Sequence, residues 1–369
     1  MKANQFLRRH LESIPPYTPI EPFEVLSARL GRAPQDIIKL DANENPYGIP
    51  DCIRQALAEM AYPHIYPDPE SRALRSALSN FSGVPQENLL AGSGADELID
   101  LILRLVLEPG DKILNCPPTF GMYAFDTDVN AGSVVNIPRQ TDFGLDLPVI
   151  QAAVDAHHPK LIFITTPNNP DGSMTPAPII DALLELRLLV VLDEAYIEFS
   201  GHGRLGEQAS YIQKASQRDN LIVLRTFSKW AGLAGLRVGY GAFPSWMMPS
   251  LWKAKQPYNV SVAASTAAIA ALEHLDLLAE TVERLRQERQ RLFNLLSEIP
   301  YLSPYPTDAN FILCKVSGVD AAQLKENLAA RYGILLRYFN KPGLQDHIRV
   351  SVGKPEHTDA LIQELKEIG

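Results

Sequence analysis

Short, continuously apolar runs recur through the middle of the sequence, and they restrict the possible folds more than any other feature. Between residues 112 and 243 these runs are KILNC, SVVNI, KLIFIT, LLVVL, NLIVLR and RVGYGAF. Segments before and between them, such as ADELIDLILRLVLEPGD and APIIDALLELR, place apolar residues at helical spacing. Buried strands that alternate with helices indicate an α/β fold with a largely parallel sheet covered on both faces.

The pattern changes after residue 260. The segment SVAASTAAIAALEHLDLLAETVERLRQERQRLFNLLSEI predicts one or two long helices. Beyond residue 300, NFILCKV, ILLRYF and HIRVSV are typical of strands, whereas AAQLKENLAARYG and the C-terminal segment are typical of helices. We therefore predict an N-terminal arm over residues 1–40, a large α/β domain over 41–275 and a small α+β domain over 276–369.

Composition excludes several classes of protein. The net charge of −9 over 369 residues argues against nucleic acid as a partner. No apolar run is long enough to span a bilayer, and the first residues lack the apolar core of a secretion signal, so we expect no membrane partner. Three widely separated cysteines, Cys52, Cys116 and Cys314, show neither metal-ligand nor disulfide spacing. We therefore expect a reducing compartment, the cytoplasm.

Polar side chains follow three of the apolar runs. In a parallel sheet the carboxyl ends of the strands share one edge, where ligands collect. Taken singly, such residues are ordinary: Asn-Pro marks a turn, aspartate caps a turn, and lysine is solvated. Their occurrence after three successive runs predicts a shared site. The residues, in chain order, are Asn168 and Asn169, then Asp193 and Tyr196, then Ser228, Lys229 and Arg237.

A glycine-containing segment, AGSGADELIDLIL, precedes one predicted helix. The free amides of a helix start form an anion site, here at Gly94, Ala95 and Asp96. A GxG before a helix is weak evidence by itself, since many are tight turns. Together with the Ser228 hydroxyl and the Arg237 guanidinium, the segment could hold a phosphate monoester.

These groups match the needs of one cofactor, pyridoxal 5′-phosphate. It requires a lysine as covalent anchor, a carboxylate against its pyridine nitrogen and a phosphate cup. Lys229 supplies the amine, and Asp193 favours the protonated pyridine nitrogen. Tyr196 and Asn169 would contact the ring oxygen. Burial and a nearby guanidinium would keep Lys229 uncharged and nucleophilic.

Four motifs of the sequence are similar to those of a known protein family: TFSKWAGLAGLRVGY, DEAYIEF, TPNNPDG and LDANENPYG. They resemble those of the fold type I, class II aminotransferases, and the similarity runs over nearly the whole chain. Within the family, the branch that acts on histidinol phosphate is the most similar. The resemblance implies a mainly parallel seven-stranded sheet between helices, together with a smaller α+β domain.

The resemblance also implies roles around the cofactor. Lys229 anchors the cofactor and moves a proton, with Asp193 and Tyr196 completing the catalytic set. Phe120 stacks on the ring, although from the residues alone it would be assigned to core packing. The other implied cofactor-binding residues are Gly94, Ala95, Asp96, Asn169, Ser228, Arg237 and Tyr66.

Tyr66 is implied to reach the cofactor of a neighbouring subunit, which predicts a homodimer with shared active sites; from the residues alone, Tyr66 would be a turn aromatic. Arg337 and Arg349 are implied to clamp the substrate anion, with Asn169 beside them and Tyr17 closing over the substrate. The implied reaction converts histidinol phosphate and 2-oxoglutarate to imidazole acetol phosphate and glutamate.

Other functions remain compatible with the same cofactor. Aromatic amino acid transamination and threonine-phosphate decarboxylation share much of the motif set. A transcription regulator of this fold would need a DNA-binding module ahead of it, whereas LDANENP begins at Leu40 behind a proline-rich segment. We therefore expect an enzyme rather than a regulator.

Overall fold

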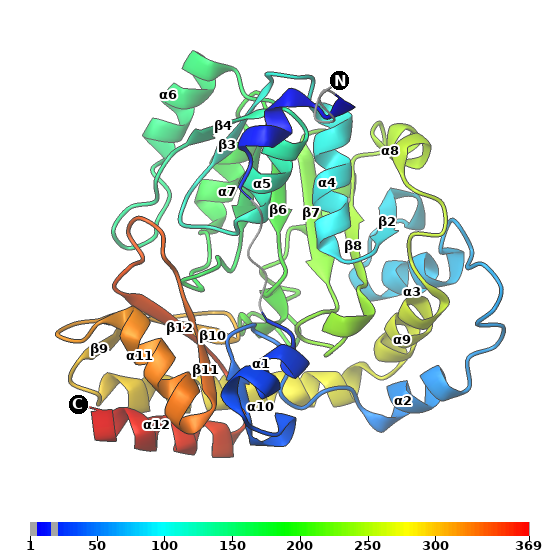
Figure 1. Ribbon diagram of the computed structural model, residues 1–369. Helices are drawn as coiled ribbons and strands as arrows, with labels where there is room; N and C mark the ends of the chain where they lie inside the picture. The colour runs from blue at the N-terminus through cyan, green and yellow to red at the C-terminus, as the bar shows by residue number, and fades with distance from the viewer. Residues whose placement is uncertain (1–5, 16–20, 369) are drawn as a thin grey trace.

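The computed structural model describes residues 6–15 and 21–368, and this part of the chain contains one sheet of seven strands and one of five. Figure 1 shows the larger sheet in green and cyan, and the smaller one beside the orange and red C-terminal elements. The predicted fold class is confirmed. Tyr17 lies outside the described residues.

The larger sheet has the order β2-β8-β7-β6-β5-β3-β4. Strand β8 runs antiparallel to its neighbours β2 and β7, and the other pairs are parallel. Every strand of this sheet except the edge strand β4 is almost fully buried, which explains the uninterrupted apolar runs. The strands are β2 (Leu89–Gly92), β3 (Lys112–Asn115), β4 (Ser133–Asn136), β5 (Leu161–Thr165), β6 (Leu189–Asp193), β7 (Leu221–Thr226) and β8 (Gly239–Ala242).

Helices cover this sheet and connect its strands (Figure 1). The amphipathic α4 lies on strands β2, β7 and β8, and its buried leucines and isoleucines belong to one apolar cluster with residues of the sheet. The helices of the larger unit are α2 (Asp51–Ala58), α3 (Arg72–Ser82), α4 (Ala95–Val106), α5 (Met122–Val129), α6 (Leu147–His157), α7 (Ala177–Leu184), α8 (Met248–Ala254) and α9 (Val262–Glu273).

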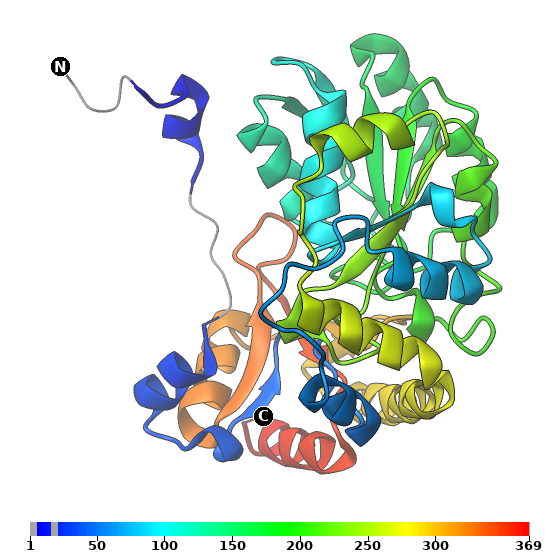
Figure 2. The same cartoon turned by 90° about the vertical axis from the view of Figure 1, so that its right-hand side faces the viewer.

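The smaller sheet has the order β1-β11-β12-β10-β9 and is mixed, because β1 pairs with β11 in parallel. Strand β1 comes from the segment that we assign to the N-terminal arm. Figure 2 shows α1, in blue, on the same side of the molecule as the orange and red elements. The remaining elements of this unit are β1 (Ile38–Leu40), β9 (Leu302–Pro304), β10 (Phe311–Val316), β11 (Ile334–Tyr338), β12 (His347–Ser351), α1 (Phe23–Leu30), α11 (Ala321–Asn327) and α12 (Pro355–Ile368).

Two helices join the units: α9 and α10, the latter spanning Leu275–Ser297. The sequence predicts one or two long helices in this segment, and the structure contains two. Across the described residues, no single helix has the length and apolar character to cross a membrane; α9 and α10 meet that test only as a pair bent by 83°. The charged face of α10 and its seven buried positions fit a helix that packs along a protein core.

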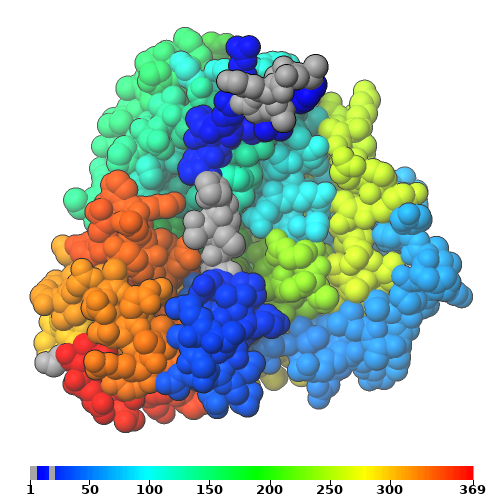
Figure 3. Space-filling view, viewed as in Figure 1, coloured from blue at the N-terminus to red at the C-terminus, as the bar shows by residue number. Residues whose placement is uncertain are grey.

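The register of the strands decides where the polar residues go. Thr165 pairs with Asp193, and Asp193 pairs with Leu224 on the next strand. The loops after β5, β6 and β7 therefore leave the sheet at one level, as the strand pattern predicts. Figure 3 shows that the orange and red surface of the small unit meets the teal surface of the large unit.

Candidate active site

A cavity of about 370 Å³ lies at the carboxyl edge of the larger sheet. Loops after three neighbouring strands and the start of α4 form its walls. It brings together most of the residues predicted for the cofactor. Its lining is Ala42, Glu44, Ala95, Asp96, Phe120, Thr165, Asn169, Asp193, Ala195, Tyr196, Thr226, Ser228, Lys229, Ala234, Gly235 and Arg237.

The start of α4 forms one end of this cavity. Its N-cap is Gly94, which has φ +81° and offers no side chain to the free amides that follow. The positive φ favours glycine here, and a Cβ at this position would displace the Arg237 guanidinium from its place against the helix start. The amides, a positive helix end and the guanidinium together favour a phosphate group.

Arg237 is held at the same end by three contacts. It donates to the Asp96 carboxylate at 3.0 Å, to the Ala234 carbonyl at 3.2 Å and to the Ser228 hydroxyl at 3.4 Å. The Arg237 backbone has φ +54°, an uncommon conformation for arginine. The tight loop thus aims the side chain back at the helix start, and the predicted phosphate-binding residues lie together.

Lys229 lines the cavity and donates to the Ala42 carbonyl at 3.2 Å. Burial and the positive charge of Arg349 lower the pKa of Lys229 to about 8, with Arg237 adding a smaller effect. From the sequence, we expect the guanidinium in the same loop, that of Arg237, to lower the pKa of the Lys229 amine. The larger influence comes instead from Arg349 in the other unit, which the sequence spacing does not reveal.

Asp193 ends β6 with its side chain almost fully buried. One carboxylate oxygen accepts a hydrogen bond from the Tyr123 hydroxyl at 2.6 Å, and the other accepts from the Ala195 amide at 3.1 Å. Burial raises the pKa of Asp193 to about 6, and the two hydrogen bonds oppose that shift. A cationic partner in the cavity would keep this carboxylate ionised.

Tyr196 and Asn169 lie on the wall that faces the small unit. The Tyr196 oxygen accepts a hydrogen bond from the Asn43 amide at 3.1 Å. The Asn169 side-chain oxygen accepts from the Arg349 guanidinium at 2.5 Å. Burial raises the pKa of Tyr196, so the phenol is a proton donor near neutral pH.

The two predicted substrate arginines are neighbours on antiparallel strands, because Arg337 of β11 pairs with Arg349 of β12. Both guanidinium groups lie 5.6 Å from the centre of the Phe339 ring. Arg349 is buried and also donates to the Asp41 carbonyl at 2.9 Å. Neither arginine is among the residues that line the cavity, although Arg349 contacts the lining residue Asn169.

Two predicted aromatic residues have different surroundings. Phe120 lines the cavity, and its ring makes an edge contact with Tyr123 at 5.5 Å between centroids. Tyr66 lies away from the cavity, is 79% exposed and stacks on Tyr258 at 4.7 Å. Within this chain, therefore, Tyr66 does not join the other predicted cofactor residues.

The sequence reasoning missed two side chains and one short segment. Tyr123 lies at the start of α5, and Phe120 precedes that helix. The bond from Tyr123 to Asp193 joins residues 70 positions apart, so no local spacing indicates it. Thr165 is the last residue of its strand and contacts the Tyr123 hydroxyl at 2.7 Å. The segment 41–43, inside the quoted motif LDANENPYG, supplies contacts to three site residues, and no spacing rule predicts such contacts between distant segments.

Comparison with known proteins gives the same family over most of the chain. Residues 35–367 match the family described as aminotransferase class I and II. A chloroplastic histidinol-phosphate aminotransferase of Nicotiana tabacum is 58% identical over 99% of this chain and 87% of its own length. The histidinol-phosphate aminotransferase of Roseiflexus castenholzii is 48% identical over 98% of both chains.

A solved structure is similar in fold as well. The histidinol-phosphate aminotransferase of Sinorhizobium meliloti, described in complex with pyridoxal-5′-phosphate, superposes with a TM-score of 0.88. It is 29% identical and covers 98% of this chain and 97% of its own.

These comparisons correct the expected cytoplasmic location. Four relatives that are 55–58% identical, from Nicotiana and Arabidopsis, are named as chloroplastic proteins. The expectation was drawn from cysteine spacing, and the three cysteines are indeed free in the structure. Free cysteines indicate a reducing environment but do not tell one reducing compartment from another, and for that reason the inference failed.

Proposed function

Because this chain belongs to the class I and II aminotransferase family, we propose that it transfers the amino group of histidinol phosphate to 2-oxoglutarate. The products are imidazole acetol phosphate and glutamate, and the cofactor is pyridoxal 5′-phosphate. The observation that carries this assignment is 58% identity over 99% of the chain to a histidinol-phosphate aminotransferase.

The cavity fits that cofactor in charge and shape. A phosphate would be held by the amides of Gly94, Ala95 and Asp96 and by the side chains of Ser228 and Arg237, which the structure gathers at one end. Because Gly94 has no side chain, the Arg237 guanidinium can lie against the start of α4. Phe120 would lie against the ring. When bound, the cofactor supplies a positively charged ring that withdraws electrons from the substrate carbon.

The remaining chemistry belongs to side chains of this protein. Asp193 would keep the ring nitrogen protonated, since a buried carboxylate favours an adjacent cation. Lys229 would be the covalent anchor and, once released, the base that moves the substrate proton. Its lowered pKa gives a substantial uncharged population near pH 8. Tyr196 and Asn169 would hold the ring oxygen.

Arg349 and Arg337 would bind the anionic end of each substrate. A guanidinium pair recognises a carboxylate or a phosphate through the same forked geometry, so one clamp serves both histidinol phosphate and glutamate. Arg349 is already fixed by Asn169 and Asp41. Tyr17, outside the described residues, completes the proposal as the residue that closes over the substrate.

A homodimer with shared active sites is part of the proposal. Tyr66 and Tyr258 stack on each other yet are 79% and 44% exposed, with exposed Tyr62 and Ile65 beside them. Such an aromatic patch on a chain of this kind fits a surface covered by a second copy. Tyr66 would then reach the phosphate in the partner's cavity. Sedimentation of the purified protein tests the assembly, and a monomer with full activity would contradict it.

We also propose that the chain works as an arm, a large domain over 41–275 and a small domain over 276–369. Arg337 and Arg349 lie on the small unit and Lys229 lies on the large unit. Relative movement of the two units would therefore open and close the site. Strand β1 moves with the small unit through its pairing to β11.

An activity panel tests the function. The purified protein with pyridoxal 5′-phosphate should form glutamate from 2-oxoglutarate when histidinol phosphate is supplied, without release of carbon dioxide. Carbon dioxide release from threonine phosphate would favour the decarboxylase instead. Faster turnover of phenylalanine or tyrosine than of histidinol phosphate would favour an aromatic aminotransferase.

A further inference from the structure

The motif LDANENPYG holds a three-residue segment, 41–43, that touches both units and three site residues. The Asp41 carbonyl accepts from Arg349, and the Ala42 carbonyl accepts from Lys229. Asn43 is 1% exposed and has φ +57°, a conformation that asparagine adopts more readily than most residues. The function proposed above gives Asn43 no role.

Asn43 is tied to the small unit by three hydrogen bonds. Its amide N–H donates to the Ser351 hydroxyl oxygen at 2.8 Å, and its side-chain oxygen accepts the Ser351 hydroxyl proton at 3.0 Å. Its carbonyl accepts from Asn310 at 2.9 Å. The remaining polar group, the side-chain NH₂, donates to the Tyr196 oxygen at 3.1 Å.

The contacts with Ser351 determine which atom of the Asn43 side-chain amide faces Tyr196. Ser351 accepts one hydrogen bond from Asn43 and returns its own proton to the Asn43 oxygen, so the amide nitrogen must face Tyr196. Turning the amide over would leave the Ser351 proton without its acceptor. Tyr196 is thus an acceptor toward Asn43, and its own proton is available for another partner.

Resting on the proposed function, we infer that Asn43 is a positioning residue that makes Tyr196 donate its proton to the ring oxygen of the bound cofactor. Because Asn43 is held by Ser351 and Asn310, the position of the small unit also fixes this donor. A donated proton stabilises negative charge on the ring oxygen. The visible absorbance of the lysine-bound cofactor should therefore titrate at lower pH than it would without that donor.

The test is the isosteric variant Asn43→Asp, which replaces the amide donor by an acceptor while keeping its oxygen for Ser351. Tyr196 would then donate to residue 43 rather than to the cofactor. We expect the absorbance midpoint to rise by about one pH unit, roughly the value of one hydrogen bond. The reconstituted protein, checked by circular dichroism, is titrated by visible absorbance.

A double-variant cycle separates this effect from the added charge. Tyr196→Phe alone should raise the midpoint, and adding Asn43→Asp to it should raise the midpoint little further. Equal shifts with and without the phenol would overturn the inference, since the charge alone would then explain them. So would an unchanged midpoint in folded Asn43→Asp.

Ser351→Ala is a second variant that adds no charge. It frees the Asn43 amide to turn, so a smaller rise in the same direction is expected, and no rise would also count against the inference. If the unaltered protein fails to bind pyridoxal 5′-phosphate, the proposed function itself is wrong. If it binds and Tyr196→Phe shifts the midpoint but Asn43→Asp does not, only the role of Asn43 is wrong.

Discussion

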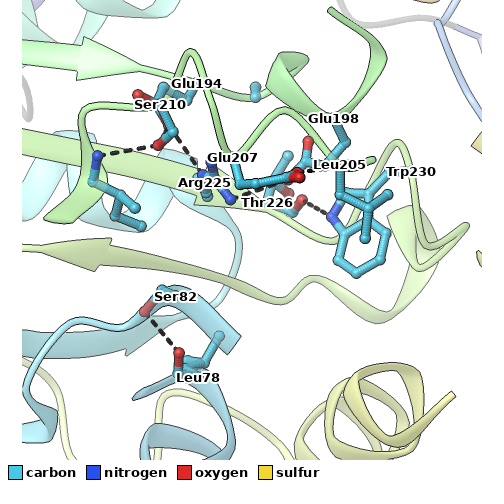
Figure 4. A network of polar contacts seen from close by, with 12 residues as sticks. Leu78, Ser82, Glu194, Glu198, Leu205, Glu207, Ser210, Arg225, Thr226 and Trp230 are labelled. Atoms are coloured by element: carbon cyan, nitrogen blue, oxygen red, sulfur yellow. Dashed lines mark hydrogen bonds and ion pairs between the residues drawn. The ribbon is translucent and has the colours of Figure 1, made fainter. Parts of the chain in front are cut away.

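Asp193 and Glu194 are consecutive carboxylates at the end of one strand, yet they lie in two differently built regions. Asp193 faces the cavity, where its bonds come from a phenol and a backbone amide. Glu194 is fully buried on the other side, where it accepts from Arg225 at 3.0 Å, Ser210 at 2.6 Å and the Tyr211 amide at 2.7 Å. Figure 4 shows Glu194, Ser210 and Arg225 side by side, joined by dashed lines.

The cations of the two regions, Arg225 and Lys229, also differ in their partners and in the direction of their pKa shifts. Arg225 lies next to two carboxylates, Glu194 and, at 3.8 Å, Glu198, and its neighbours raise its pKa well above the usual range. Lys229 has a carbonyl as its hydrogen-bond partner, and its pKa is lowered. The buried region neutralises its charges within the chain, whereas the cavity leaves charges for a ligand to complete. That contrast distinguishes a functional cluster from a structural one.

Replacing the cation on the cavity side should abolish activity and preserve the fold. Lys229→Ala should lower kcat by roughly 10⁴-fold, the upper end of what a positioned proton-transfer group contributes, while the thermal midpoint changes little. Lys253→Ala, an exposed lysine of α8, is the matched control and should keep full activity. Retained transamination in Lys229→Ala would remove the central role given to this amine.

Replacing Arg225, the cation of the buried region, should lower the stability of the fold and preserve activity. Arg225→Met leaves Glu194 and Glu198 buried without their partner, which should lower the free energy of unfolding by about 3–5 kcal/mol. Urea denaturation measures it, and the folded fraction should keep its kcat. The exposed pair of Arg218 and Glu185 provides the control, since Arg218→Met should change stability by less than about 1 kcal/mol. Similar losses in both variants would contradict the distinction.

The arginine clamp sharpens the contrast, because Arg349 is buried like Arg225 but donates to the Asn169 side-chain oxygen and to the Asp41 carbonyl. Arg349→Ala should raise the KM for glutamate roughly 10²-fold, about 2.8 kcal/mol, with a smaller change in stability than Arg225→Met. Steady-state kinetics at saturating cofactor measure the change. An unchanged KM would exclude Arg349 from substrate binding.

We expect the hydrogen bond from Tyr123 to Asp193 to strengthen cofactor binding about tenfold. Removing the hydroxyl in Tyr123→Phe takes away a hydrogen bond to a charged group, so the pKa of Asp193 rises and pyridoxal 5′-phosphate binds roughly tenfold less tightly. Equilibrium dialysis of the apoprotein gives the affinity. Tyr301→Phe also loses a buried bond, to the Leu365 carbonyl, but should bind the cofactor normally.

The smallest effect concerns the pH dependence of the lysine. The lowered pKa means that the reactive amine accumulates as pH rises through about 8, so cofactor capture by the apoprotein should level off above that pH. The unfolded chain holds this proton up to its normal pKa, so apoprotein stability should also rise with pH between about 8 and 10.5. Arg349→Met should move the capture midpoint upward by less than about one unit. Stopped-flow absorbance measures the rate.

Most of the larger sheet and the order of its polar loops could be predicted, because buried parallel strands leave an unbroken apolar signal. Strand β1 could not: with three residues and a partner nearly 300 positions away, its pairing depends on tertiary contact rather than on local pattern. The same reason applies to Arg349, whose effect on Lys229 exists only after the two units meet. It applies to Tyr123 as well, because its bond to Asp193 joins residues 70 positions apart in the chain.

The pairing of β1 with β11 has a consequence for how the chain acquires its structure during synthesis. All strands of the seven-stranded sheet lie between residues 89 and 242, so that sheet can assemble while the rest of the chain is still being translated. In the five-stranded sheet, by contrast, the edge strand β1 pairs with a strand nearly 300 residues further along the chain. The segment at residues 38–43 must therefore wait until β11 and β12 have been synthesised, and only then can it contact the lysine amine, the tyrosine phenol and the arginine together.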